Sequence, residues 1–197
     1  MEERFRRVKD EVRILGVDDG PHKRTDKDVL VVGVVFRGGR FMDGVLSMRT
    51  AVDGLDATEN LVKMVSMCHF KDLRVVMTDG ISLGGFNVID LPTLTEATGL
   101  PAISIMREMP DYDAVKKALS YLPDADKRWR TIQSAGKPRP VETQKGKQIY
   151  AQAVGIKWED AVRVVKVSAT HSLLPEPIRA AHLIARGVTL GESRGRA

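Results

Sequence analysis

Two aspartates stand directly after short apolar runs, where a carboxylate has left the core but is still held by it. Asp18 follows the run Val12–Val17, and Asp79 ends the run that begins at Leu73. Neither run has a helical period, so each predicts a buried strand. Ligand sites in open α/β sheets collect at the carboxyl ends of such strands. Paired carboxylates there are hard oxygen ligands that suit Mg²⁺ or Mn²⁺.

Two further carboxylates are candidates to complete such a metal site. Hydrolysis of a phosphodiester by bound metal ions usually needs a third or fourth acidic group. Asp19 adjoins Asp18, and Asp53 lies in the predicted loop Thr50–Asp56. Asp53 reaches the site only if that loop bends back. For any of these aspartates taken alone, the alternative is a turn or a helix cap.

The segment after Asp79 is a loop with three glycines and one serine, Ser82. It is not a P-loop, because no Gly-Lys-Ser/Thr follows. Its glycines either cradle a phosphate or simply connect a strand to a helix. The four histidines are scattered and make no metal-ligand spacing. His182 is interpreted as a packing or surface residue of the last helix.

The element order predicts the fold class. Val29–Phe36 and Phe41–Met48 flank Arg37-Gly38-Gly39-Arg40, which is typical of a hairpin turn. The remaining pattern predicts helices over 58–70, 90–98, 111–122, 158–167 and 175–186, and strands over 73–79, 102–106 and 149–154. This order is typical of a ribonuclease H-like α/β fold: a three-stranded antiparallel meander, α-β-α-β crossovers completing a mixed sheet, and C-terminal helices. No Gly-x-Gly-x-x-Gly follows the first strand, which argues against a dinucleotide-binding sheet.

Length and composition indicate one domain over residues 1–197, since 43% of the residues are hydrophobic and 29% are charged. The chain starts without the apolar stretch of a signal peptide, and Val29–Phe36 is too short to span a bilayer. We therefore expect a soluble, cytoplasmic protein that does not enter a membrane. The single cysteine, Cys68, is read as a small core residue. The oligomeric state is not predicted.

The positive charge is concentrated in one segment, 123–148, which is predicted to be irregular, with a helical turn over 127–133 as an alternative for part of it. It holds seven of the basic residues and one acid, Glu142, between 127 and 148, while the whole chain carries a net charge of +5. Such a segment beside a near-neutral body favours a nucleic-acid partner, and the alternative is a solvated lysine-rich excursion. The candidate contacts are Arg128, Trp129, Arg130, Lys137, Arg139, Lys145 and Lys147. Trp129 either stacks on a base or anchors the segment, and residues 187–197 are predicted to be a loose tail.

The strand-end motifs resemble endonuclease V and, more closely, an archaeal family related to it. Gly16-Val17-Asp18 is similar to the motif of its first catalytic aspartate, and Val76–Gly80 to the strand that carries its second. The strand that ends at Arg107 is similar to one that ends in a catalytic lysine in endonuclease V. Leu174-Pro175-Glu176-Pro177-Ile178-Arg179 resembles the start of a C-terminal helix in that enzyme. The resemblance implies catalytic roles for Asp18, Asp79 and Arg107, with the guanidinium binding phosphate rather than moving protons.

Several positions depart from the endonuclease V pattern. Thr50 stands where the resemblance implies a metal-binding glutamate, and Ile81 and Gly85 stand at histidine positions. The strand-opening Pro-Tyr-Ile-Pro wedge is replaced by residues 40–43, in which Phe41 either stacks on a base or packs in the hairpin. A late acidic or histidine position is expected near Val154–Gly155.

These observations predict a divalent-metal-dependent, endonuclease V-like protein that acts on nucleic acid, with phosphodiester hydrolysis near altered bases as the chemistry. Two alternatives stay open. One is a binding module on the same fold that lost catalysis with the glutamate. The other is a metal-dependent enzyme on a small phosphorylated substrate, with the glycine loop holding the phosphate.

Overall fold

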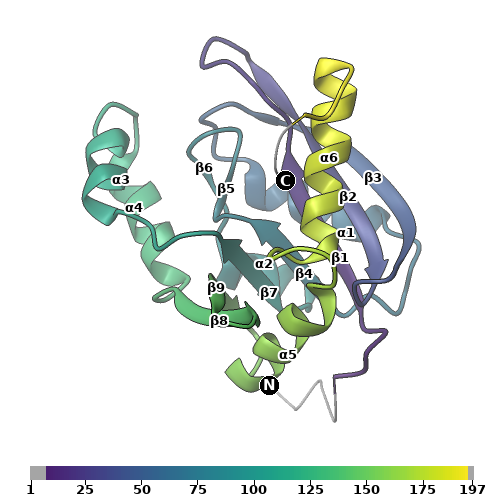
Figure 1. Cartoon of the computed structure of the whole chain (residues 1–197). Coiled ribbons are helices and arrows are strands. Elements are labelled where there is room, and N and C mark those ends of the chain that lie inside the picture. Colours follow the sequence, from purple (N-terminus) through teal and green to yellow (C-terminus); the bar gives the residue numbers. More distant parts are fainter. Residues whose placement is uncertain (1–7, 195–197) are drawn as a thin grey trace.

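A mixed sheet of seven strands runs through the centre of the molecule, in the order β3-β2-β1-β4-β7-β9-β8 (Figure 1). The structure is a computed structural model that describes residues 8–194. The strands of this sheet are β1 (Arg13–Asp19), β2 (Asp28–Arg37), β3 (Phe41–Ala51), β4 (Val75–Asp79), β7 (Ala102–Met106), β8 (Arg139–Gln144) and β9 (Lys147–Val154). A separate small hairpin pairs β5 (Ser82–Leu83) with β6 (Asn87–Val88).

The sheet has the predicted ribonuclease H-like arrangement. β1, β2 and β3 form an antiparallel meander, while β4 pairs with β1 in parallel and β7 pairs with β4 in parallel. β9 then returns antiparallel to β7, and β8 closes the sheet at its far edge. The carboxyl ends of β1, β4 and β7 therefore lie side by side along one end of the sheet, the carboxyl edge.

Helices cover both faces of the sheet because the central strands are buried on both sides. They are α1 (Ala57–Met67), α2 (Leu91–Thr98), α3 (Tyr112–Leu119), α4 (Ala125–Ser134), α5 (Trp158–Ser168) and α6 (Glu176–Leu190). α1 and α2 pack on one face around Leu15 and Val76, and α5 and α6 pack on the other around Ile14 and Met77. α6 lies across β1 and β2, as Figure 1 shows.

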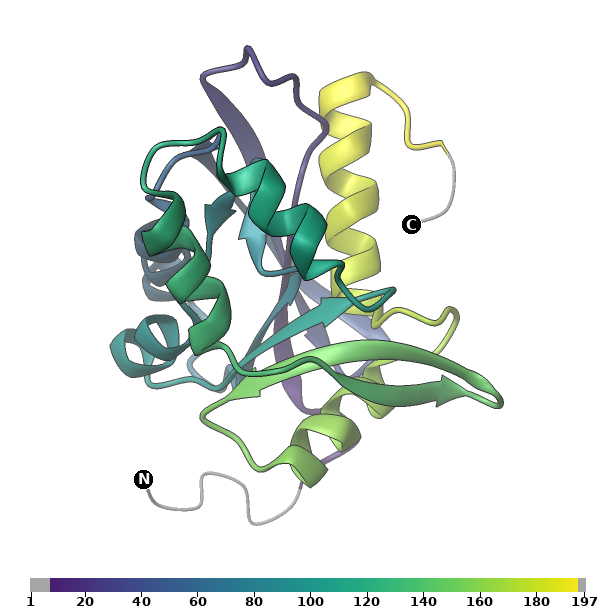
Figure 2. The ribbon, with the colours of Figure 1, turned by 90° about the vertical axis from the view of Figure 1, so that its left-hand side faces the viewer.

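α3 and α4 form a separate layer beside the β5–β6 hairpin (Figure 2). Leu119 of α3 and Ile132 of α4 bury a small apolar cluster against Val88. Asp111 accepts hydrogen bonds from the first turn of α3, and Asp90 caps α2 in the same way. The helix predicted over 90–98 agrees with α2, which ends at the left-handed Gly99.

The segment 123–148 is not irregular: the helical turn considered over 127–133 belongs to α4, and the unpredicted β8–β9 hairpin follows it. The apolar periodicity of α4 and β8 is weak, because most of their residues are of types that usually face water. α4 buries Arg128 as well as Ile132, and β8 buries only Val141 of its six residues. A buried arginine and a single buried valine leave little apolar periodicity to read.

The predicted loose tail is also corrected, since α6 continues to Leu190 and ends at the left-handed Gly191. Gly187, the first residue of the predicted tail, lies inside the helix with open space around its Cα. Residues 195–197, at the end of the predicted tail, lie outside the described residues. No helix within residues 8–194 is both long and apolar enough to cross a membrane.

Candidate metal centre

Asp18 and Asp79 lie side by side at the edge of the sheet where β1 and β4 end. Val17 is paired with Thr78 across these two parallel strands. Asp18 and Asp79, the next residue of each strand, therefore lie at the same level. Asp18 is 6% exposed, and Asp79 is half-buried. The strands thus bring together the two carboxylates that the sequence proposed as neighbours.

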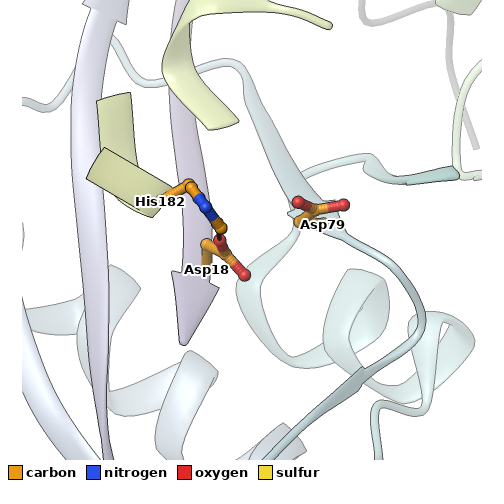
Figure 3. A group of neighbouring side chains, drawn as sticks. All are labelled: Asp18, Asp79 and His182. Atoms are coloured by element: carbon orange, nitrogen blue, oxygen red, sulfur yellow. Dashed lines mark hydrogen bonds and ion pairs between the residues drawn. The ribbon is translucent and has the colours of Figure 1, made fainter. Parts of the chain in front are cut away.

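The third member of the site is His182, which comes from α6. Its Nδ1 lies 2.8 Å from Oδ2 of Asp18. The metal-ligating atoms of Asp18, Asp79 and His182 all lie within 4.8 Å of one another (Figure 3). Sequence reasoning missed His182 because no spacing rule links it to a partner at the other end of the chain.

α6 reaches Asp18 because it packs directly on the backbone of β1. Gly16 faces Pro177 so closely that an added Cβ would collide with the proline backbone. His182 follows on the same helix, above the end of β1. The position expected near Val154–Gly155 does not reach this site, since Val154 pairs with Ala102 at the opposite end of β7.

The two carboxylates of this cluster repel each other, while His182 attracts both. Burial and the charge of Asp18 raise the pKa of Asp79 to about 7, although Arg107 and His182 act to lower it. The hydrogen bond to Asp18 raises the pKa of His182 above its ordinary value, against the effect of burial. The charges of Asp18 and Asp79 thus repel each other, and a bound cation would relieve that repulsion.

Asp19 points away from this cluster, because successive side chains of a strand face opposite sides of the sheet. Its Oδ2 lies 3.4 Å from Nδ1 of His22. Burial, with the charge of Asp18, raises the pKa of Asp19 to about 6, although a hydrogen bond from the Gly84 backbone acts to lower it. Asp19 thus shares the electrostatics of the site from the other face of β1.

Of the two other predicted site residues, Arg107 lies near Asp79, whereas Asp53 is not part of the cluster. Arg107 directly follows β7, is exposed, and lies close enough to act on the pKa of Asp79. Asp53 has a left-handed backbone, with a φ of 51°, and its Oδ1 accepts a hydrogen bond from the Phe86 backbone at 2.8 Å. The structure does not bring Asp53 into the group formed by Asp18, Asp79 and His182.

The donor set fits a divalent cation. Two carboxylates offer the oxygen ligands that Mg²⁺ and Mn²⁺ prefer, and the imidazole is a ligand for softer metals or a hydrogen-bond partner that orients a carboxylate. The hydrogen bond between His182 and Asp18 is of the second kind. Asp18 and Asp79 are therefore the residues that would hold the cation.

Comparison with known proteins identifies the family. The sequence profile of Endonuclease dU matches residues 10–189. The chain belongs to the Endonuclease dU family. A relative named UPF0215 protein, from Methanothermobacter thermautotrophicus, is 50% identical over 98% of this chain and 95% of its own.

Solved structures place the Endonuclease dU fold beside endonuclease V. A protein of unknown function from Archaeoglobus fulgidus has a TM-score of 0.80 and 33% identity, covering 89% of this chain and 97% of that one. Endonuclease V from Streptomyces avermitilis has a TM-score of 0.62 and 15% identity, covering 91% of this chain and 82% of its own. Endonuclease V from Ciona intestinalis, in complex with DNA containing an inosine, has a TM-score of 0.56 and 16% identity, covering 86% and 82%. The predicted relation to endonuclease V is confirmed at the level of family and fold.

Thr50, at the position of the expected glutamate, is fully buried in a polar network of this Endonuclease dU protein. Its hydroxyl donates to Oδ1 of Asp56 at 2.8 Å and accepts from the Asn87 and Asn60 amides. Burial raises the pKa of Asp56, but hydrogen bonds led by that of Asn87 outweigh it and hold the pKa below its usual value. Thr50 thus stabilises the loop before α1 and offers no carboxylate to the metal site.

Two residues predicted to contact nucleic acid, Arg128 and Trp129, contact other parts of the protein instead. Arg128 is 2% exposed, and its guanidinium donates to the carbonyls of Pro123, Asp53, Gly54 and Phe86. It fastens α4 to two loops, so its prediction as a nucleic-acid contact is wrong. Trp129 packs edge-on against Tyr112 and beneath the Lys116 ammonium. The anchoring alternative describes Trp129 better than the base-stacking one.

Phe41 is exposed rather than packed in the hairpin, with the Arg37 guanidinium over its ring. It lies at the far end of the sheet, because Arg37 pairs with both Phe41 and Arg13, the first residue of β1. Asp18 is at the other end of that strand. The structure therefore separates Phe41 from the cluster of Asp18, Asp79 and His182.

The remaining basic candidates are exposed. Lys145 and Lys147 lie at the tip of the β8–β9 hairpin, Arg130 lies on α4, Arg139 begins β8, and Lys137 lies in the connection between these two elements. Met106 pairs with Tyr150, so the first residues of β9 extend past the end of β7. The hairpin tip therefore projects from the edge of the sheet that carries Arg107 and Asp79 (Figure 2).

Proposed function

We propose that this protein is a divalent-metal-dependent endonuclease that hydrolyses a phosphodiester bond close to an altered base. The observation that carries the proposal is the meeting of Asp18, Asp79 and His182 within 4.8 Å at the carboxyl edge of the sheet. Arg107 and the basic tip of the β8–β9 hairpin lie on that same edge. Carboxylates that can hold a cation suit a phosphodiester substrate when a guanidinium and lysines lie beside them.

The chain's own residues have separate tasks in this mechanism. Asp18 and Asp79 would hold the cation, which would supply Lewis-acid chemistry at the phosphodiester and a more acidic water. Arg107 binds a phosphate oxygen through its planar guanidinium and stays charged throughout. A carboxylate can only accept hydrogen bonds, so Nδ1 of His182 carries the proton that faces Asp18. The hydrogen bond to Asp18 also raises the pKa of His182 and so favours the imidazolium, in which Nε2 carries a second proton that it can deliver to the leaving oxygen.

The family and its structural neighbours support the choice of substrate. The family is called Endonuclease dU, and the Ciona endonuclease V was crystallised with DNA containing an inosine. Uracil and hypoxanthine, the base of inosine, are the deamination products of cytosine and adenine. We therefore take DNA with a deaminated base as the first substrate to test.

A non-catalytic nucleic-acid-binding protein is the second candidate function, and Thr50 favours it. The resemblance implies a metal-binding glutamate at this position, and Thr50 is instead committed to Asp56 and Asn87. Such a protein would keep the basic hairpin tip and bind nucleic acid without cleaving it. The two functions differ in the effect of metal on the substrate.

The test is cleavage of single- and double-stranded DNA and RNA that contain uracil or hypoxanthine, or neither, with Mg²⁺ or Mn²⁺. Asp79→Asn is purified in parallel, with Glu96→Gln as the control, because Glu96 is an exposed acid on α2. We expect cleavage by the native protein and by the control, and none by Asp79→Asn or in EDTA. Nucleic-acid binding without cleavage in any metal would favour the second function. Competition by free nucleotides at equal affinity would favour a small phosphorylated substrate.

A further inference from the structure

Arg186 lies on α6 one turn beyond His182, on the side of the helix that faces the candidate metal centre. Residues four apart on a helix share one face, and His182 uses that face to reach Asp18. Helical side chains lean toward the N-terminus of their helix, so the Arg186 guanidinium leans back toward His182. It is close enough to act on the pKa of His182. The second half of α6 thus adds an arginine to the surroundings of the metal centre.

The end of β1 fixes this part of α6 in place. Gly20 directly follows β1, and an added Cβ there would lie 2.7 Å from the Thr189 hydroxyl and 3.4 Å from the Ala185 carbonyl oxygen. Ala185, the residue before Arg186, is fully buried. Arg186 is therefore held beside the strand end that carries Asp18.

The Arg186 guanidinium has no partner in the part of the chain that the structure describes. Its Nε is buried but donates no hydrogen bond, and no carboxylate among residues 8–194 pairs with it. By contrast, Arg179 on the same helix pairs with Glu176. A buried N–H without an acceptor is rare, and a ligand that supplies the acceptor is one explanation. The planar fork of a guanidinium matches the oxygens of a phosphate.

Arg186 and Arg107 lie on the same face of the sheet, on opposite sides of the two carboxylates. Asp79 pairs with Ile105, which belongs to the core on the α6 side, and the alternation of β7 directs Arg107 to that same side. The strands follow one another in the order β7, β4, β1, and α6 lies over β1. β7 and β1 are therefore about 10 Å apart, with the carboxylates between the two arginines.

The positive charge continues past Arg186 in the loop between β1 and β2. Lys23, Arg24 and Lys27 are exposed there, and none of them forms an ion pair within the described residues. Asp26 is the single acid of residues 20–27. Because this loop starts against α6, a polyanion that leaves the metal centre past Arg186 meets further cations.

We propose that Arg186 binds a phosphate of a nucleic-acid strand on the α6 side of the metal centre, while Arg107 binds another on the β7 side. The substrate is then a strand that continues on both sides of the metal centre. A small phosphorylated molecule fills only one of the two positions. This inference rests on the proposed function for the place of the reacting phosphate, and it adds the direction in which the strand crosses the carboxyl edge.

The test is the binding of a short fluorescent single strand in EDTA, where no metal chemistry occurs, at several salt concentrations. Arg186→Met removes the charge and keeps much of the aliphatic packing, whereas Arg186→Lys keeps the charge. For Arg186→Met, we expect weaker binding of every sequence and a slope of log K against log salt that falls by ~0.7, the value of one phosphate contact on a single strand. Arg186→Lys should keep the native slope.

Arg74→Met is the matched control, because Arg74 is exposed at the opposite end of β4. Thermal unfolding of each variant shows whether it folds. The NMR signal of the Arg186 Nε–H gives a second measurement, made on the native protein and assigned by its absence from Arg186→Lys. This signal should shift when the strand is added in EDTA, because the nitrogen gains an acceptor, and the Arg74 signal should not.

The outcomes distinguish this inference from the proposed function. A reduced slope in folded Arg186→Met, with a shifted Nε–H signal, supports the inference even if no metal produces cleavage and the nuclease proposal fails. Metal-dependent cleavage by the native protein, with an unchanged slope in Arg186→Met, overturns the inference and leaves the nuclease proposal standing. An Nε–H signal that stays in place while the strand binds overturns it too, as does an equal fall in slope for Arg74→Met.

Discussion

His182 and Asp18 are 164 positions apart in the chain, and yet their side chains lie 2.8 Å apart at the edge of the sheet. α6 produces this contact by lying on the backbone of β1, where Gly16 leaves room for Pro177. The contact orients Asp18 and leaves the second imidazole nitrogen free. His182 thereby links the C-terminal helix to the candidate metal centre.

His182→Ala is predicted to slow metal-dependent cleavage by about 100-fold, the usual contribution of a positioned acid or base. The reason is the loss of both the proton carried by Nε2 and the hydrogen bond that orients Asp18. We also expect weaker binding of Mn²⁺, by roughly tenfold or more, because partners of metal ligands tune metal affinity. Rates at saturating metal and a metal titration measure the two effects separately.

His69→Ala is the control for this prediction. His69 is exposed near the end of α1 and contacts Phe70, far from the cluster. The control should keep the native rate and metal affinity. Native rates in His182→Ala would remove the imidazole from the mechanism.

Asp79→Asn is predicted to stabilise the metal-free protein at high pH. The folded state raises the pKa of Asp79 from 3.8 to about 7, chiefly through burial and the charge of Asp18. Folding therefore favours the protonated carboxyl, and the resulting penalty grows from pH 4 and is complete above pH 7. We expect Asp79→Asn to raise the melting temperature by about 5 °C at pH 8, with the gap closing toward pH 4.5.

The measurement is thermal unfolding in EDTA at several pH values, with Glu96→Gln as a control that should show no such pH dependence. Addition of Mn²⁺ should stabilise the native protein at pH 8 and leave Asp79→Asn unchanged, because a cation bound only by the folded state stabilises it. An Asp79→Asn protein that melts below the native one at pH 8 would contradict the assigned electrostatics.

The central strands and the ends of α2 were readable from the sequence because the physical signal is local. A valine-rich run ending at Asp79 predicts a buried strand, and Asp90 and Gly99 mark the ends of α2 through their own backbone preferences. Since parallel neighbours align their carboxyl ends, the fold class then brought Asp18 and Asp79 together. These steps need no knowledge of distant contacts.

His182 and Arg128 were misread because their roles depend on partners far away in the chain. His182 is an ordinary helix residue until α6 packs on β1. Arg128 looks like a solvated charge until its guanidinium meets carbonyls from two loops. Tertiary contacts of this kind override the usual exposure of charged residues, and no local pattern in the sequence reports them.

Arg128→Ala and Arg130→Ala are predicted to change different properties of the protein, the first its stability and the second its binding of nucleic acid. Arg128→Ala leaves buried carbonyls unpaired, so we expect a loss of roughly 3 kcal/mol in the free energy of unfolding. Arg130 is exposed on the same helix, and its removal should leave stability unchanged and weaken nucleic-acid binding. Chemical denaturation and binding titrations measure the two. Equal stability of both variants would contradict the anchoring role of Arg128.

Replacing Lys145 and Lys147 with alanine is predicted to reduce the salt dependence of single-strand binding. If both lysines contact phosphates, the slope of log K against log salt should fall by ~1.4. The control pair is Lys71 and Arg74, exposed cations at the opposite end of β4. An unchanged slope in the lysine variant would show that the two lysines are solvated and do not contact phosphates.

Gly16→Ala is predicted to displace α6 from β1 and so to separate His182 from Asp18. The added methyl group collides with the Pro177 backbone, which cannot move without shifting the helix, at a cost of about 2 kcal/mol. Gly187→Ala, in α6 itself, meets open space and should stabilise the helix by ~0.5–1 kcal/mol. Melting temperatures test the stabilities, and the NMR titration of His182 tests the contact. In Gly16→Ala the pKa of His182 should fall back toward its ordinary value, because the hydrogen bond to Asp18 is what raises it. An unchanged titration would mean that another contact positions α6.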